Sequence, residues 1–162
     1  MSLGCYKMNQ SDNYYMDIAL EEARKADAKL EVPVGAVVVH SGQVIGRGHN
    51  LREASQDPTS HAEMIAIRAA AKEIDSWRLE EADLYVTLEP CPMCAGAILQ
   101  ARLKKVVYGA TDPKAGAAGT LYNLLEDNRF NHQVELVTGV RAEESSQLLK
   151  DFFRQLRLGK DG

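Results

Sequence analysis

The chain has 162 residues, of which 45% are hydrophobic and 26% are charged, and this composition excludes a fibrous or largely disordered protein and is typical of one globular domain. The formal net charge of -4 excludes a uniformly basic surface for nucleic acid, although a local basic patch stays compatible with it. Because no apolar run approaches the roughly 20 residues that cross a bilayer and no signal-peptide pattern opens the chain, we expect a cytoplasmic protein without a membrane partner.

The first predicted element is an amphipathic helix. Residues 1–10 open with Met-Ser-Leu-Gly and are interpreted as a tag or disordered N-terminus, so that a single domain covers residues 11–160. Apolar residues recur at the helical period across residues 11–30, with charged residues between them. Ser11 and Asp12 are residue types that favour the N-cap, and they are predicted to begin this helix.

Two short β-rich runs follow, at residues 34–40 and 43–48. Ser41 and Gly42 separate them, which predicts a hairpin with a two-residue turn. The next segment, residues 51–60, is polar and is predicted to be a loop.

The middle of the chain alternates helices with strands. Residues 61–74 are rich in alanine and predict a buried helix, in which Ser60 and Glu63 can form a capping box. Residues 82–88 predict a strand, and residues 91–102 predict a helix that has a proline in its first turn, where proline is tolerated.

The remaining elements complete the predicted fold. Residues 104–110 predict a strand, residues 111–125 a glycine-rich loop that leads into a short helix, residues 132–140 a last strand, and residues 142–158 a final helix. The alternation of strands and helices after residue 60 predicts a layered α/β domain around a mixed sheet, with the hairpin at one side.

The three cysteines of the sequence predict a metal or redox role rather than disulfides. Their number is odd, and Cys91 and Cys94 stand three residues apart at the start of a predicted helix, so both thiols face one side and a single ion can reach them. The positive end of the helix dipole favours the thiolate form that a metal needs. His61 stands at the start of another predicted helix and supplies a third ligand for zinc, which leaves the fourth position for water.

Glu63 stands two residues after His61, where a carboxylate can take a proton from a water that zinc activates and pass it on. From the residues alone, three other interpretations stay open. Glu63 can be a plain capping-box residue, and the two cysteines can be a redox pair. A closed structural zinc site is the third, with a fourth ligand among His40, His49 and His132.

The motifs "HAE" at residues 61–63 and "PCPMC" at residues 90–94 together resemble the signature of the zinc-dependent cytidine deaminase-like superfamily. Across residues 14–158 the chain is similar to the bacterial tRNA-specific adenosine deaminases, in stretches such as "DPTSHAEMIAIR" and "WRLEEADLYVTLEPCPMCAGAI". The resemblance implies a three-layer α/β/α sandwich with a five-stranded sheet and one Zn²⁺ per chain. It also implies a homodimer that deaminates the wobble adenosine of an arginine tRNA anticodon to inosine.

The resemblance also implies roles for individual residues around the reacting base. His61, Cys91 and Cys94 bind zinc, and Glu63 carries the proton during hydrolytic attack at C6 of adenine. Asn50 corresponds to an asparagine that contacts the flipped purine. From local sequence alone, a turn asparagine at the end of the second strand explains Asn50 equally well.

Further positions correspond to RNA contacts in the family. Asp112 and Lys114 match a loop that contacts the anticodon, and a turn with solvated charges is their alternative. Phe153 matches an aromatic residue that packs near the extruded nucleotides. Because Phe152 and Phe153 are adjacent on a helix, they must face different ways, and at least one of them is expected in the core.

The C-terminal segment carries four basic residues spaced mostly by three or four positions, which places them along one side of a helix. These residues are Lys150, Arg154, Arg157 and Lys160. The resemblance implies that Arg154 and Arg157 contact phosphates, whereas a solvated helix face is the ordinary explanation.

Two rival functions remain at this point. The first is a deaminase of a free base or nucleoside, such as guanine or cytosine, which would use the same zinc and glutamate. The second is a noncatalytic RNA-binding module that zinc stabilises. The rivals make different predictions, because only an enzyme needs Glu63 and only an RNA binder needs the basic C-terminal helix.

Overall fold

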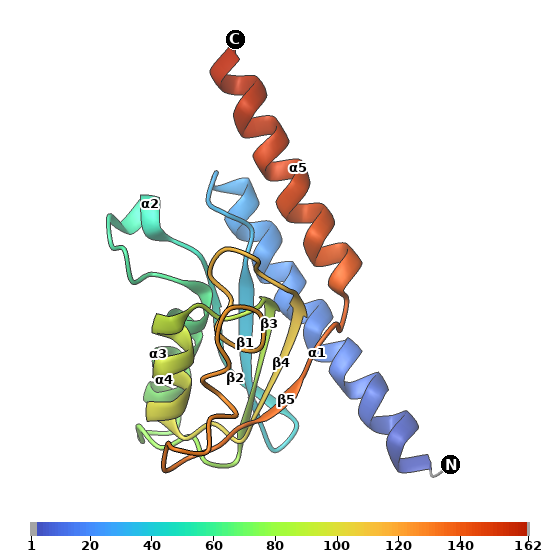
Figure 1. Cartoon of the computed structure of the whole chain (residues 1–162), viewed down its shortest axis with the longest axis vertical. Coiled ribbons are helices and arrows are strands. Elements are labelled where there is room, and N and C mark those ends of the chain that lie inside the picture. Colours follow the sequence, from blue (N-terminus) through green and yellow to red (C-terminus); the bar gives the residue numbers. More distant parts are fainter. Residues whose placement is uncertain (1–2, 162) are drawn as a thin grey trace.

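A five-stranded sheet lies between two layers of helices (Figure 1). The computed structural model describes the backbone of residues 3–161 and the side chains of residues 11–159. Helices α1 (Leu3–Ala28) and α5 (Ala142–Asp161) cover one face of the sheet, and α3 (Ala62–Glu73) and α4 (Pro92–Ala101) cover the other. The predicted three-layer α/β/α sandwich around a five-stranded mixed sheet is therefore confirmed.

The hairpin at one side of the sheet consists of β1 (Gly35–His40) and β2 (Gln43–His49), which pair antiparallel. Ser41 and Gly42 form the predicted two-residue turn, and both have positive φ angles, 50° and 75°. Positive φ at both central residues is the conformation of a type I′ turn, whose twist matches that of the flanking strands.

The other three strands are parallel to one another, and their order explains where a site can form. The sheet order is β2-β1-β3-β4-β5, in which β3 (Ala82–Leu88) pairs antiparallel with β1 and parallel with β4 (Lys105–Ala110). The short β5 (Glu135–Val137) adds parallel to β4. The carboxyl ends of β3 and β4 therefore meet at one edge of the sheet, the place where open α/β sheets hold ligands.

The strands bury side chains on both faces, because helices cover both. Alternate residues of the central strands enter two separate hydrophobic clusters, as the period of two in a strand requires. The cluster under α3 and α4 includes Val38, Leu84, Val86, Val106 and Tyr108. The cluster under α1 includes Met16, Ala19, Val37, Tyr85 and Val107.

Helix α1 begins at Leu3, earlier than predicted, so the cap assigned to Ser11 and Asp12 is wrong. Asp12 is instead buried inside the helix, where its carboxylate accepts a hydrogen bond from the Tyr85 hydroxyl at 2.9 Å and pairs with Lys105 at 3.2 Å. A capping residue type can lie within a helix when tertiary partners satisfy its side chain. The interpretation of residues 1–10 as a tag stays a prediction.

Three further element predictions differ from the structure. The polar segment after β2 contains a short helix, α2 (Arg52–Ser55), and the last strand is shorter than residues 132–140. Residues 111–125 form turns and one isolated bridge between Ala118 and Asn123, without the predicted helix. Within the part of the chain that the structure describes, no helix combines the length and the hydrophobicity that crossing a membrane requires.

Candidate active site and metal centre

Three metal-ligating side chains meet at the carboxyl edge of the sheet. His61 is the N-cap residue of α3, Cys91 is the N-cap residue of α4, and Cys94 lies in the first turn of α4. The Nδ1 atom of His61 is 3.5 Å from the Sγ atom of each cysteine, and the three donor atoms all lie within 4.8 Å of one another. Two helix N-termini are thus brought together by residues 30 positions apart in the chain.

These distances fit a zinc ion. A zinc ion about 2.0 Å from an imidazole nitrogen and about 2.3 Å from a thiolate, at the tetrahedral angle, holds those donors about 3.5 Å apart. The group contains three donors among the described residues. His49 and His132 have other partners, and His40 lies at the hairpin turn, so none of them completes a closed structural site. The donor set is therefore that of an open zinc site.

The electrostatics of the two thiols differ. The hydrogen bond with Cys94, together with the contact with His61, lowers the pKa of the Cys91 thiol to about 4. The same hydrogen bond and burial raise the pKa of the Cys94 thiol, which is fully buried. The bond to Cys91 raises the pKa of His61 despite the opposing effect of burial. This environment favours the thiolate at Cys91 and opposes a second one at Cys94, so a cation would stabilise the pair of thiolates.

Glu63 faces the same site as His61, although residues two apart on a helix point about 200° apart. His61 has extended backbone angles, φ -79° and ψ 154°, so only Glu63 has helical geometry and the two side chains can converge. The Glu63 side chain is almost fully buried, and burial raises its pKa to about 7. A carboxyl group with such a pKa can both accept and release a proton near neutral pH.

A cavity of about 480 Å³ opens in front of these residues. This volume lies in the ordinary range for small-molecule sites, and a purine base fits within it. Cys94 lies behind the cavity wall, while most of the other residues that the sequence singled out line it. They are Asn50, His61, Glu63, Cys91, Asp112, Lys114 and Phe153.

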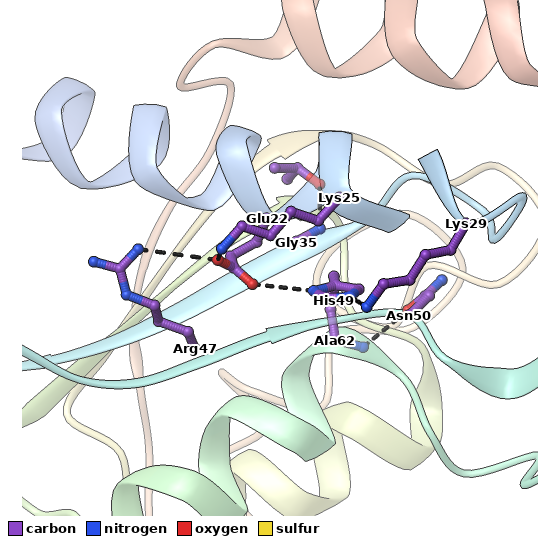
Figure 2. Close-up of polar contacts among 9 residues, drawn as sticks. Glu22, Lys25, Lys29, Gly35, Arg47, His49, Asn50 and Ala62 are labelled. Atoms are coloured by element: carbon purple, nitrogen blue, oxygen red, sulfur yellow. Dashed lines mark hydrogen bonds and ion pairs between the residues drawn. The ribbon is translucent and has the colours of Figure 1, made fainter. Parts of the chain in front are cut away.

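Asn50 caps helix α3, a role that the sequence pattern predicted for Ser60. The Asn50 Oδ1 atom accepts a hydrogen bond from the Ala62 backbone N–H at 2.8 Å, at the start of α3 (Figure 2). The Ser60 hydroxyl contacts the Ser55 hydroxyl instead, and no side chain of the N-cap residue bonds to the helix, so the predicted capping box is wrong. Asn50 therefore reaches across from the end of β2 to cap α3.

A polar network anchors the end of β2 just before Asn50. The buried Glu22 carboxylate of α1 accepts from the Nδ1 atom of His49 at 3.0 Å, and the His49 Nε2 atom contacts Lys29 at 2.9 Å (Figure 2). Lys25 also pairs with Glu22 at 2.6 Å. This network ties the first helix to the strand that delivers Asn50 to the cavity.

Asp112 lies in a turn, which was the alternative to an RNA contact, and the two adjacent phenylalanines differ in burial. Asp112 forms a turn, in which its Oδ1 atom accepts from the backbone N–H groups of Lys114 at 3.0 Å and Ala115 at 3.1 Å. Phe152 is buried, whereas Phe153 is 41% exposed and lines the cavity. The prediction that the two phenylalanines face different ways is confirmed.

Arg154 and Arg157 lie on α5, outside the cavity lining, and both are exposed. Arg154 pairs with Asp151 at 3.1 Å. The last turns of α5 extend past the body of the domain (Figure 1). Lys160 has a side chain outside the described residues.

Sequence reasoning missed two buried glutamates beside the cavity. Glu89 is 2% exposed and lines the cavity wall, and Glu31, also 2% exposed, accepts hydrogen bonds from the backbone N–H groups of Glu53 and Ala54 in α2. Arg52, at the start of α2, lines the cavity as well. An ionisable residue directly after an apolar strand was the available signal for Glu89.

Comparisons with known proteins identify the family of the chain. The family model of the MafB19-like deaminases matches residues 10–157. The tRNA-specific adenosine deaminase of Bacillus subtilis is 57% identical over 149 residues, which are 92% of this chain and 92% of that protein. The protein of the same name from Haemophilus influenzae is 50% identical over 92% of this chain and 87% of its own length.

Solved structures of deaminases match the chain as well. A structure from a study of A-to-I editing by tRNA:A34 deaminases at the wobble position matches with a TM-score of 0.81 and 43% identity, over 84% of this chain and 99% of that chain. A guanine deaminase from Bacillus subtilis matches with a TM-score of 0.60 and 42% identity, over 66% of this chain and 69% of that one. The adenosine deaminases match the chain with higher identity and coverage than the guanine deaminase does. The chain therefore belongs to the tRNA-specific adenosine deaminases of the zinc-dependent cytidine deaminase-like superfamily.

Proposed function

We propose that this chain catalyses the zinc-dependent hydrolytic deamination of adenosine to inosine at the wobble position of a tRNA anticodon, that of an arginine tRNA. The observation that carries the chemistry is the His61, Cys91 and Cys94 group, which lies beside the buried Glu63 in one cavity. The substrate follows from the relatives, because two proteins named tRNA-specific adenosine deaminases are 57% and 50% identical to this chain over the aligned residues.

In this proposal Glu63 is the group that moves protons. His61, Cys91 and Cys94 would hold a zinc ion, which would supply a Lewis acid that lowers the pKa of a bound water from about 15.7 towards about 7. Glu63 accepts a proton from the attacking water and places a proton on N1 of adenine as C6 is attacked. Glu63 then takes the remaining hydroxyl proton from the oxygen on C6 and gives it to the departing amino group, so that the C6–N bond breaks and inosine and ammonia are released.

The cavity lining supports roles for the other residues. We propose that Asn50, whose side chain reaches into the lining, contacts the purine, and that Phe153 packs beside the extruded nucleotides. Asp112 and Lys114 are proposed to contact neighbouring nucleotides of the anticodon. A base that has left its stack can enter the site, which is how enzymes reach a target base in structured RNA.

A substrate comparison tests the proposed function. The enzyme is incubated with an arginine tRNA anticodon stem–loop that carries adenosine at the wobble position, and separately with adenine, guanine, cytosine and adenosine. We expect inosine only in the RNA. Because the chain is similar to a guanine deaminase, guanine is the most informative of the alternative substrates. Turnover of a free base alone would overturn the proposal.

The basic face of α5 leads to a prediction about RNA affinity. Replacing Arg154 and Arg157 together with alanine should weaken stem–loop binding and reduce the magnitude of its log–log salt slope by about 1.4 to 1.8, since each phosphate contact contributes about 0.7 to 0.9. Fluorescence anisotropy at several salt concentrations measures the slope. The control is Arg78→Ala. Arg78 is an arginine outside α5, where it lies over Trp77 and pairs with Glu80, so its loss should leave the slope unchanged. An unchanged slope in the double variant would show that α5 does not contact phosphates.

We also propose that the chain acts as a homodimer in the cytoplasm, where translation requires its tRNA product. Large apolar side chains are exposed along the segment that follows the 111–120 loop, and a second copy of the chain would cover them. They are Leu121, Tyr122 and Phe130. Light scattering after size exclusion should give the mass of two chains, and the mass of one chain would overturn the dimer.

A further inference from the structure

A second carboxylate, that of Glu89, lies in the cavity wall but is fully occupied by the protein itself. Glu89 stands between the end of β3 and the N-terminus of α4 and is 2% exposed. Its Oε1 atom accepts from the Asp112 backbone N–H at 3.0 Å and from the Thr120 hydroxyl. Its Oε2 atom accepts from the backbone N–H groups of Ala118 and Thr120, both at 3.1 Å. Both oxygens are therefore engaged by one loop, residues 111–120.

The two buried carboxylates of the cavity differ in their surroundings. Burial by itself raises the pKa of Glu89, but its hydrogen bonds to Thr120, Asp112 and Ala118 outweigh this effect and hold its pKa below the usual value. The Glu63 carboxyl lacks such a set of donors, and its pKa is raised. The two oxygens of Glu89 are already engaged by four donors of one loop, and this geometry suits an anchor.

The 111–120 loop wraps closely around the Glu89 carboxylate. A Cβ atom on Gly116 would lie 2.4 Å from the carboxylate carbon, so no larger residue fits there without displacing Glu89. The Ala117 N–H donates to the Pro90 carbonyl at 2.9 Å, which ties the loop to the segment that carries Cys91. Asp112, held by Glu89 through its own N–H, shapes the turn that presents Lys114 to the cavity.

We propose that Glu89 is a positioning residue that holds the 111–120 loop, with Asp112 and Lys114, at the rim of the cavity. This inference rests on the proposed function, in which that loop contacts RNA. A loop that is ordered before binding does not lose its conformational freedom when the substrate docks. Substrate binding therefore depends on Glu89, whereas zinc binding and the chemical step at Glu63 do not.

The main test replaces Glu89 with glutamine. The glutamine side chain has the same size, but its amide nitrogen cannot accept hydrogen bonds. The N–H donors of the loop that face this nitrogen therefore lose their acceptor. We expect the KM for the stem–loop to rise about tenfold or more and kcat to change less than about threefold, with zinc content near one per chain. Hydrogen exchange of residues 112–120 should become faster, which mass spectrometry measures.

A matched pair at Thr120 gives a second test that leaves Glu89 in place. Thr120→Val removes only the hydroxyl donor and should raise the KM by a smaller factor in the same direction, because three backbone donors remain. Thr120→Ser keeps the hydroxyl and should retain the wild-type KM. This pair decides the question if Glu89→Gln does not fold.

The possible results are distinguishable. Unchanged KM and unchanged exchange in Glu89→Gln, or equal KM values for Thr120→Val and Thr120→Ser, would overturn the proposal. Loss of zinc from folded Glu89→Gln would also overturn it, since Glu89 would then support the metal ligands. If the wild-type enzyme does not deaminate the stem–loop, the proposed function fails, while hydrogen exchange of residues 112–120 still tests the anchoring by Glu89.

Discussion

Inosine formation is expected to fall about 10²- to 10⁴-fold when Glu63 is replaced by alanine, while zinc content stays near one per chain. Glu63 lines the cavity beside His61 and Cys91 but does not belong to the group of metal-ligating atoms. Its removal deletes the acid–base group without removing a ligand, and positioned proton transfer contributes about this factor to enzymatic rates. Single-turnover assays with the anticodon stem–loop and metal analysis of the same preparation measure the two quantities.

Two further variants make this result specific. Glu63→Gln keeps the size and the burial of the side chain but cannot exchange a proton, so it should be as inactive as Glu63→Ala. Glu73→Ala removes an exposed glutamate at the other end of the same helix and should leave inosine formation unchanged. An active Glu63→Ala enzyme would show that another group moves the proton, and the noncatalytic RNA-binding alternative predicts no activity in any form.

Replacing Cys94 with alanine is expected to abolish zinc binding and inosine formation together and to lower the stability of the domain. Zinc held by His61, Cys91 and Cys94 would join the N-termini of α3 and α4, so its binding free energy adds to that of folding. A chelator should therefore lower the Tm of the wild-type protein. The Tm of the Cys94→Ala protein should already be low and should not respond to the chelator.

Cys5→Ser provides the control for this experiment, because it removes the third cysteine of the sequence and no proposed ligand. Its zinc content, Tm and response to chelator should equal those of the wild-type protein. Retention of stoichiometric zinc by Cys94→Ala would contradict the ligand assignment, and retention of activity after complete removal of zinc would contradict the proposed chemistry.

The regular elements could be predicted because their signals are local. The turn at Ser41 and Gly42 and the proline at the start of α4 each depend on neighbouring residues alone, and both predictions are confirmed. The caps are different. Ser11 and Ser60 have the residue types of N-caps, yet α1 begins before Ser11. Helix α3 is capped by Asn50, which is 12 residues before Ala62 in the chain.

In the candidate site, too, the residues with a local sequence signal were predicted, and the residue that depends on distant partners was missed. The spacing of Cys91 and Cys94 alone left a redox pair and a metal site open, and His61 with Glu63 favoured the metal site by supplying a third donor and an acid–base group. Glu89 was missed, although it lies two residues before Cys91, because its partners are more than 20 residues further along the chain. Nothing in the loop sequence reports that its backbone N–H groups converge on one carboxylate.

Local sequence patterns were enough to predict the layered α/β fold class, the hairpin, and the residue types proposed for an open zinc site and its proton carrier. These depend on periodicity and short spacing, which the backbone geometry of helices and strands converts directly into shared faces. Three features are visible only in the folded chain: Asn50 caps α3, the extended His61 lets Glu63 face the same cavity, and Glu89 accepts hydrogen bonds from the 111–120 loop. Each of these depends on where separate elements meet, and a buried polar group is satisfied by whichever donor or acceptor the packing brings to it.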